Sequence, residues 1–369
     1  MPKIFELFGF RLDDQSTVAK AARKGALCPF MGIECDGGGN RYMSALMLSS
    51  HKEVAKLYPS RETLPAGVCS IQMKSNERPW VVCPRRLLFF GKGGVAKRAY
   101  QSAIQTELLR LSGFAANEQI GVWPELKLKY SEGKGADIKS FDYTFDYMLM
   151  RVGRISQGTV ERATGMEWKS IQRIVEKAGY PVSKVGGDYF ISEFPLEEPV
   201  IIEIMTSSTS GGNKDKGTTI PAAFSNALLG KEHDAPGINY RQVWARMVSQ
   251  LVVKSEVALG WRGKTLWVLQ DTLVDYISST TALDIRKFLA ASTDEVNILC
   301  ISYGGKLDSP STGVIEMEDI KLFSGPIEPP SRDKRTPSFL DMVRSPTRPS
   351  LSALYGLLMK RRPVNVFTV

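Results

Sequence analysis

The sequence predicts an α/β fold with a mixed central sheet flanked by helices. The segment VIIEIMT at 200–206 is a strongly apolar run of the kind that forms a buried strand. Residues 240–259 repeat apolar side chains at helical spacing, with Val243, Met247 and Leu251 on one face. Two further short apolar runs, at 265–270 and 296–303, predict additional strands. Strands that alternate with helices in this way favour a sheet covered by helices.

The segments before this core fit the same plan. Residues 99–114 have helical periodicity, residues 125–130 alternate as a strand does, and residues 141–152 predict another strand. An insertion at 154–196 predicts two short helices separated by glycine and then a hairpin. This insertion is similar to a small helix-turn-helix or winged unit, with Lys169 and Arg173 on its second helix as candidate DNA contacts. A scaffold role for the insertion remains an equal alternative.

We expect three regions: a cysteine-containing part at 1–95, a core at 96–330 and a tail at 331–369. The 369 residues suffice for a sizeable hydrophobic core, and 43% apolar against 24% charged residues is ordinary for a globular protein. No apolar run approaches the ~20 residues that span a bilayer. The first residues also lack the pattern of a signal peptide. We therefore expect an intracellular protein with no membrane partner.

The charge balance is basic, which favours a polyanionic partner. The formal net charge is +9, and nucleic acid is the commonest polyanion that basic proteins bind. Eight basic residues fall in the Pro- and Ser-rich tail: Arg332, Lys334, Arg335, Arg344, Arg348, Lys360, Arg361 and Arg362. This tail is either an arm that follows DNA phosphates or a solvated terminus.

Four of the five cysteines fall in the first quarter of the chain, and they predict a metal site. They are Cys28, Cys35, Cys69 and Cys83. In an intracellular protein, grouped cysteines favour metal binding over disulfides, and four thiolates can enclose a structural iron or zinc. Their spacings are wider than those of C-x-x-C knuckles, so four separate buried thiols are the alternative. Cys300 lies in an apolar strand and is most simply a core residue.

The acidic residues predict a phosphodiester-hydrolysing site. Glu203 interrupts the apolar strand at 200–206, and a buried carboxylate is usually paired, metal-bound or protonated. Asp142 and Asp146 lie in the neighbouring predicted strand. Carboxylates from adjacent strands can hold Mg²⁺, which polarises a phosphate and activates water. An Asp followed later by Glu-x-Lys is the signature of PD-(D/E)XK nucleases, although the pattern by itself matches many chains.

Several motifs together resemble the NotI type of restriction endonuclease over about residues 4–303. They are IFELFGFRL at 4–12, CPF at 28–30, GVC at 67–69, WVVCPRRLL at 80–88, PELKLKY at 124–130, TFDYML at 144–149, VIIEIMT at 200–206 and VWARMVSQLVVKS at 243–255. The cysteine motifs are the most specific part. The resemblance implies a PD-(D/E)XK nuclease core and a small four-cysteine subdomain with structural iron. It also implies a homodimeric, prokaryotic, cytoplasmic enzyme that cuts specific sites in double-stranded DNA, and a cognate methyltransferase that protects host DNA.

Carried over by residue, the resemblance assigns Glu203 as a Mg²⁺ ligand and Glu125 as a supporting carboxylate. It favours Asp146 over Asp142 as the second Mg²⁺ ligand. Met205 departs from the pattern, because the superfamily usually has Lys there. Arg246 and Gln250 are expected on one polar helix stripe with Gln242 and are candidates to complete the site. Lys214, Lys216, Arg85 and Arg86 are further candidate DNA contacts.

Three functions follow, in order of preference. The first is an endonuclease in which each subunit cuts one strand and leaves a 5′-phosphate. The second is a metal-containing DNA-binding protein with a degenerate nuclease core, for which Met205 is the main argument. The third is a nuclease for structured RNA or single strands. The two histidines, His51 and His233, have no ligand-spaced partner, and the glycine runs lack the lysine of a P-loop.

Overall fold

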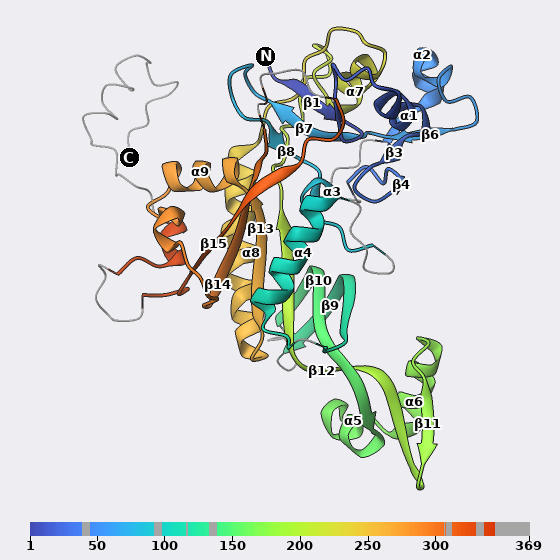
Figure 1. The fold of residues 1–369 in the computed structure, drawn as a ribbon, viewed down its shortest axis with the longest axis vertical. Coiled ribbons are helices and arrows are strands. Elements are labelled where there is room, and N and C mark those ends of the chain that lie inside the picture. Colours follow the sequence, from blue (N-terminus) through green and yellow to red (C-terminus); the bar gives the residue numbers. More distant parts are fainter. Residues whose placement is uncertain are drawn as a thin grey trace, which may run out of the picture.

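A seven-stranded mixed sheet forms the centre of the molecule in the computed structural model (Figure 1). The structure describes residues 1–38, 45–91, 98–115, 117–132, 139–305, 307, 312–329 and 336–343. The strand order is β15-β14-β13-β12-β10-β9, and β11 pairs with β12 outside this path. The predicted α/β plan, with a mixed central sheet flanked by helices, is confirmed at this level.

Three parallel strands form the middle of the sheet, and antiparallel strands lie beside them. The strands are β9 (Ile120–Glu132), β10 (Lys139–Ser156), β11 (Val182–Val185), β12 (Asp188–Met205), β13 (Lys264–Gln270), β14 (Val296–Tyr303) and β15 (Met317–Gly325). Strands β12, β13 and β14 run parallel, so each pair needs a crossover. Helices α8 (Tyr240–Gly260) and α9 (Asp271–Thr280) provide these crossovers, while α4 (Ala99–Ser112) covers the opposite face (Figure 1).

The ends of the long helices follow local rules of capping. The side chain of Asn239 accepts a hydrogen bond from the backbone N–H of Gln242 at 3.2 Å and caps the start of α8. Gly113 ends α4 in the left-handed conformation, at φ 81°. Both helices lie where their apolar periodicity predicts them.

The N-terminal part forms a four-stranded sheet, β2-β1-β7-β8, and two small hairpins. Its strands are β1 (Lys3–Leu7), β2 (Phe10–Arg11), β3 (Leu27–Cys28), β4 (Ile33–Glu34), β5 (Ala45–Met47), β6 (Thr63–Pro65), β7 (Val68–Gln72) and β8 (Trp80–Val81). Its helices are α1 (Thr17–Gly25), α2 (Lys52–Ala55) and α3 (Pro84–Leu87), and α7 (Ile220–Leu228) packs on β1. One hydrophobic core joins Leu7 of this part to Trp267 of the central sheet. The expected boundary near residue 95 is therefore not a boundary between two cores.

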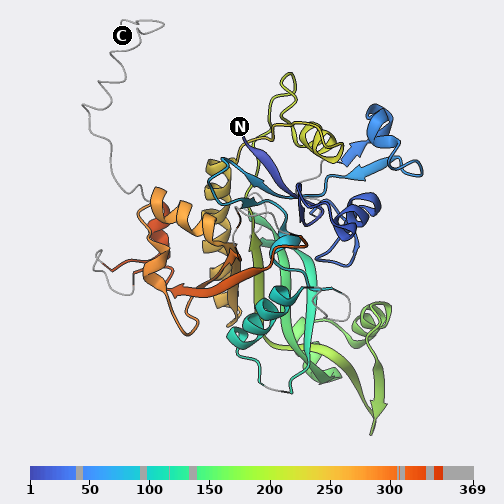
Figure 2. The ribbon, with the colours of Figure 1, turned by 45° about the horizontal axis from the view of Figure 1, so that its top comes forward.

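The insertion at 154–196 contains the predicted two helices and hairpin. Helices α5 (Gln157–Thr164) and α6 (Trp168–Lys177) are separated by Gly165 at φ 68°, and β11 pairs with the first residues of β12. The insertion has a hydrophobic cluster of its own around Trp168 and Ile191. Figures 1 and 2 show it at the far end of the long strands β10 and β12, projecting from the sheet.

Part of the expected tail packs on the core. Phe339 and Met342 are fully buried. The indole N–H of Trp244 donates to the carbonyl oxygen of Met342 at 3.1 Å, which attaches this segment to α8. The prediction of a free tail from residue 331 is therefore wrong for 336–343. The eight basic residues of the tail lie outside the described residues.

Candidate active site

Asp146 and Glu203 lie side by side at the end of the pairing between β10 and β12. The preceding pair in register is Tyr147 with Ile202. The backbone N–H of Asp146 donates to Oε1 of Glu203 at 3.3 Å, and Oδ2 of Asp146 accepts from the backbone N–H of Ile204 at 2.9 Å. Both carboxylates are buried. Of the two candidate acids on β10, Asp142 and Asp146, it is Asp146 that is the buried neighbour of Glu203.

Lys254 of α8 completes this group, and it was not among the predicted site residues. Its Nζ lies 2.6 Å from Oε2 of Glu203 and donates to the carbonyl oxygen of Thr144 at 2.7 Å. The ammonium also lies 5.7 Å from the centre of the Phe145 ring. Lys254 thus supplies a positive charge to the site, which the buried and uncharged Met205 cannot do.

Burial and the neighbouring Asp146 carboxylate together raise the pKa of Glu203 to about 7. The Lys254 ammonium and its hydrogen bond act in the opposite direction. The two adjacent carboxylates repel each other when both are ionised. A divalent cation bound between them would relieve that repulsion.

A polar cavity of about 600 Å³ opens beside this group. Asp142, Thr144 and Lys254 line it together with the predicted helix stripe of Gln242, Arg246 and Gln250. Arg246 donates to the hydroxyl of Ser208 in the loop after β12 at 3.1 Å. Asp142 is exposed, so it lines the cavity but does not belong to the buried pair.

The remaining predicted residues of the nuclease site do not belong to the buried group of Asp146, Glu203 and Lys254. Glu125 lies on β9 between Pro124 and Leu126, which pair with Tyr147 and Phe145, so it stands beside Asp146 in the sheet register. Its side chain is largely exposed and accepts a hydrogen bond from the guanidinium of Arg85 at 3.3 Å. Lys214 and Lys216 are exposed on the loop after β12 and do not line the polar cavity.

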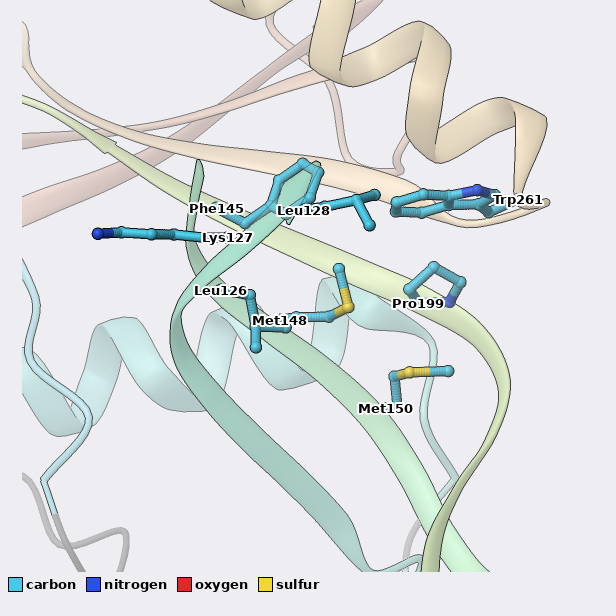
Figure 3. A pocket seen from close by; sticks show the side chains of 8 residues that line it. All are labelled: Leu126, Lys127, Leu128, Phe145, Met148, Met150, Pro199 and Trp261. Carbon is cyan, nitrogen blue, oxygen red and sulfur yellow. The ribbon is translucent and has the colours of Figure 1, made fainter. Parts of the chain in front are cut away.

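A second cavity, of about 570 Å³, is apolar, and Phe145 is among the side chains that line it (Figure 3). It is lined by Leu126, Lys127, Leu128, Phe145, Met148, Met150, Pro199 and Trp261. Among the described residues that line it, Lys127 alone is charged and none is a carboxylate. Because acid–base chemistry and metal binding both need polar groups, the polar cavity next to Glu203 is the better candidate for catalysis.

The four N-terminal cysteines gather in one place, although they come from three separate segments. All are buried and none forms a disulfide. Cys69 and Cys83 are hydrogen-bonded to each other. Cys83 is also close enough to Cys28 and Cys35 for its charge to raise their pKa values. In the described part of the chain, however, no three or more His, Cys, Asp or Glu side chains are arranged to hold a metal ion as they stand.

Backbone N–H groups point at each of these sulfur atoms. Gly9 donates to Cys69 at 3.2 Å, and Gly37 donates to Cys35 at 3.4 Å. The N–H groups two and three residues after Cys28 and after Cys83 do the same. Such donors stabilise thiolates. Burial nevertheless raises the pKa of Cys28 to about 12, so without a cation this thiol is protonated.

Arg85 and Arg86, two of the predicted DNA contacts, have little or no exposed side-chain surface. The side chain of Arg86 is fully buried and pairs with Glu6 at 3.1 Å. The prediction that Arg86 contacts DNA is therefore wrong, because a buried, paired guanidinium cannot reach a phosphate. Arg85 is 15% exposed and is held by Asp36 at 2.9 Å.

On the insertion, Lys169 and Arg173 are exposed on one face of α6, as predicted, and Lys177 continues the stripe.

One sequence signal could have identified Lys254. The buried face of α8 consists of Val243, Met247, Leu251, Lys254, Ser255 and Ala258. A lysine at an apolar position of an amphipathic helix needs a buried partner, since an unpaired buried ammonium is costly. The spacing alone therefore singles out Lys254, although it cannot identify Glu203 as the partner.

No family model, no curated protein and no solved structure matches the chain. Within the described residues, no helix is both long enough and apolar enough to cross a membrane. The resemblance drawn from the sequence motifs therefore stays a prediction, and the geometry of the site has to carry the functional argument.

Proposed function

We propose that the protein is a Mg²⁺-dependent endonuclease that cuts double-stranded DNA at a specific site. The observation that supports this most is the group formed by Asp146, Glu203 and Lys254 at the edge of a polar cavity. Two carboxylates on adjacent strands and a cation from the helix beside them suit metal-assisted phosphodiester hydrolysis. The finer description, a dimeric type II enzyme in which each subunit cuts one strand to leave a 5′-phosphate, rests on the sequence motifs.

The chemistry of the donor set fits a hard divalent cation. Carboxylate oxygens of Asp146 and Glu203 would hold Mg²⁺, and substrate phosphate and water would complete its ligands. The bound ion would activate water and neutralise charge on the phosphate. Lys254 would take the role that the missing lysine at Met205 has in related nucleases. From its place between Glu203 and the carbonyl of Thr144, its ammonium can orient the attacking water and stabilise the charged transition state.

The surroundings of the site fit a duplex phosphate backbone. Arg246 and Gln250 line the same cavity as Asp142 and offer donors to phosphate oxygens. The overall charge of +9 adds a sequence-independent attraction to DNA. On the projecting insertion, Lys169, Arg173 and Lys177 would contact a second stretch of the same duplex.

The four thiols are proposed to hold a structural iron or zinc ion. The fit rests on four buried cysteines that converge and on the N–H groups directed at their sulfur atoms. This ion would order the N-terminal part, which shares its core with the central sheet. A homodimer and a protecting DNA methyltransferase complete the proposal.

The test is digestion of a phage genome by wild type, Glu203→Gln and Lys254→Met, each with Mg²⁺ and with EDTA. We expect discrete fragments only from wild type with Mg²⁺. Sequencing of the fragment ends would give the site, and binding to the same DNA should persist in Glu203→Gln.

A DNA-binding protein without catalysis is the second candidate. The observation that favours it is that Lys254 already occupies one oxygen of Glu203, while Met205 is buried. Uncut DNA in every lane, with tight binding by all three proteins, would overturn the endonuclease and support this alternative.

A further inference from the structure

The side chain of Arg85 contacts residues that adjoin the cysteine cluster and residues that adjoin Asp146 of the carboxylate site. Its guanidinium donates to Oδ2 of Asp36 at 2.9 Å, to Oε1 of Glu125 at 3.3 Å and to the hydroxyl of Tyr147 at 3.4 Å. It also lies 5.3 Å from the centre of the Phe89 ring. A side chain with this many partners and little exposure is fixed in position.

On the cysteine side, each contact of Arg85 is next to a thiol. Asp36 directly follows Cys35, whose sulfur accepts from the backbone N–H of Gly37. The backbone N–H of Arg85 itself is directed at Cys83. Any movement of Cys35 or Cys83 therefore displaces a partner of Arg85 or Arg85 itself.

On the carboxylate side, the contacts are next to Asp146. Tyr147 directly follows Asp146, and Glu125 stands beside Asp146 in the register of β9 and β10. Glu125 has a φ of 51°, a left-handed conformation that a strand residue other than glycine rarely adopts. Such strain persists only where the surroundings enforce it, and the ion pair with Arg85 is the contact that holds the Glu125 side chain.

We propose that Arg85 is a positioning residue that couples the cysteine cluster to the carboxylate site, so that the state of the thiols sets the affinity of Asp146 and Glu203 for a divalent cation. The inference rests on the proposed metal-dependent function. A planar guanidinium can hold Asp36, Glu125 and Tyr147 together, whereas the ammonium of a lysine, with three donors around one nitrogen, cannot reproduce that geometry. Charge alone is therefore not sufficient at this position.

The test measures Mn²⁺ binding, which replaces Mg²⁺ and is followed through the electron paramagnetic resonance signal of the free ion. The proteins are wild type, Arg85→Lys, Arg85→Ala and the matched control Arg78→Ala, which removes an exposed arginine paired with Asp271. We expect both Arg85 variants to bind Mn²⁺ about 10-fold more weakly or worse, as for other residues that orient metal ligands. Arg78→Ala should bind as wild type does. Circular dichroism checks that each variant is folded.

A double-mutant cycle then separates coupling from simple damage. Cys35→Ser should weaken Mn²⁺ binding in the wild-type background but have little further effect in Arg85→Lys, because the connection is already broken. Unchanged Mn²⁺ affinity in both Arg85 variants would overturn the inference, and so would fully additive effects of Cys35→Ser and Arg85→Lys. A wild-type protein that binds no Mn²⁺ would overturn the proposed function as well.

Discussion

Among the described residues, two ion pairs are buried on both sides, and they differ in how completely they are satisfied. Glu6 and Arg86 are both fully buried, and Glu6 also accepts from Ser70 at 2.9 Å and from Tyr303 at 2.6 Å. The guanidinium of Arg86 donates in addition to the hydroxyl of Tyr100 at 2.8 Å. This pair has one carboxylate for one guanidinium, and a hydrogen-bonded neighbour on each side.

The Glu203–Lys254 pair is shorter, at 2.6 Å against 3.1 Å, but remains incomplete. A second carboxylate, Asp146, adjoins it, and a polar cavity opens next to Lys254. The contrast teaches that burial of an ion pair does not by itself indicate function. An excess of one charge beside an open polar space does, because that charge can be compensated by a ligand.

The largest expected effect is on the complete pair. Arg86→Ala leaves the Glu6 carboxylate buried without its cation, and breaking a buried pair in this way costs about 3–5 kcal/mol. The free energy of unfolding, measured with urea, should fall by that amount or the protein should fail to fold. Arg78→Ala, at an exposed pair, should change it by less than about 1 kcal/mol. Equal effects of the two substitutions would contradict the structural role of Arg86.

The incomplete pair should respond in activity more than in stability. Lys254→Met removes the cation that would act on the transition state, and we expect cleavage to fall about 10²- to 10³-fold. Its cost in unfolding free energy should be smaller than that of Arg86→Ala, because Glu203 can take up a proton near neutral pH. Single-turnover cleavage and urea unfolding of the same preparations check both statements. A stable variant with wild-type cleavage would remove Lys254 from the mechanism.

The pH dependence of stability sharpens the comparison further. Since folding raises the pKa of Glu203 from 4.5 to about 7, its contribution to stability is fully present below pH 4.5 and is lost as the pH rises through about 7. Metal-free wild type should therefore lose more thermal stability than Glu203→Gln between about pH 5 and pH 8. Melting curves in EDTA at a series of pH values measure the difference. Parallel curves for the two proteins would contradict the raised pKa.

The smallest effect is expected far from both pairs, on the insertion. Lys169→Ala and Arg173→Ala should each weaken DNA binding by a similar factor on all sequences, and each should lower the salt dependence of log Kd by about 1 if it contacts a phosphate. The control is Lys184→Ala, since the ammonium of Lys184 lies 5.1 Å from the centre of the Tyr189 ring within the same insertion. Titrations of fluorescent duplex at several salt concentrations measure this. Salt slopes unchanged from wild type would assign the insertion to the scaffold.

Much of the fold was predictable because its signals are local. The helical periodicity at 240–259 became α8 nearly as predicted, whereas the apolar run at 200–206 is only the last part of β12, which begins at Asp188. The two helices of the insertion also formed as predicted. The N-terminal sheet was not predicted, because short strands such as β2 and β8 carry too little periodicity. The packing of Phe339 against the core was missed because Pro- and Ser-rich composition indicates an exposed terminus.

The sequence by itself determined that one carboxylate, Glu203, is buried in an apolar strand and that four cysteines cluster near the start of the chain. Only the tertiary structure decided which groups meet these residues. Asp146 lies 57 residues before Glu203, and Lys254 lies 51 residues after it. No local pattern sets such pairings, since they depend on the register of β10 with β12 and on the rotation of α8 about its axis. The same holds for Arg85, which follows a cysteine in the chain but reaches Glu125 only because the two parts of the protein share one core.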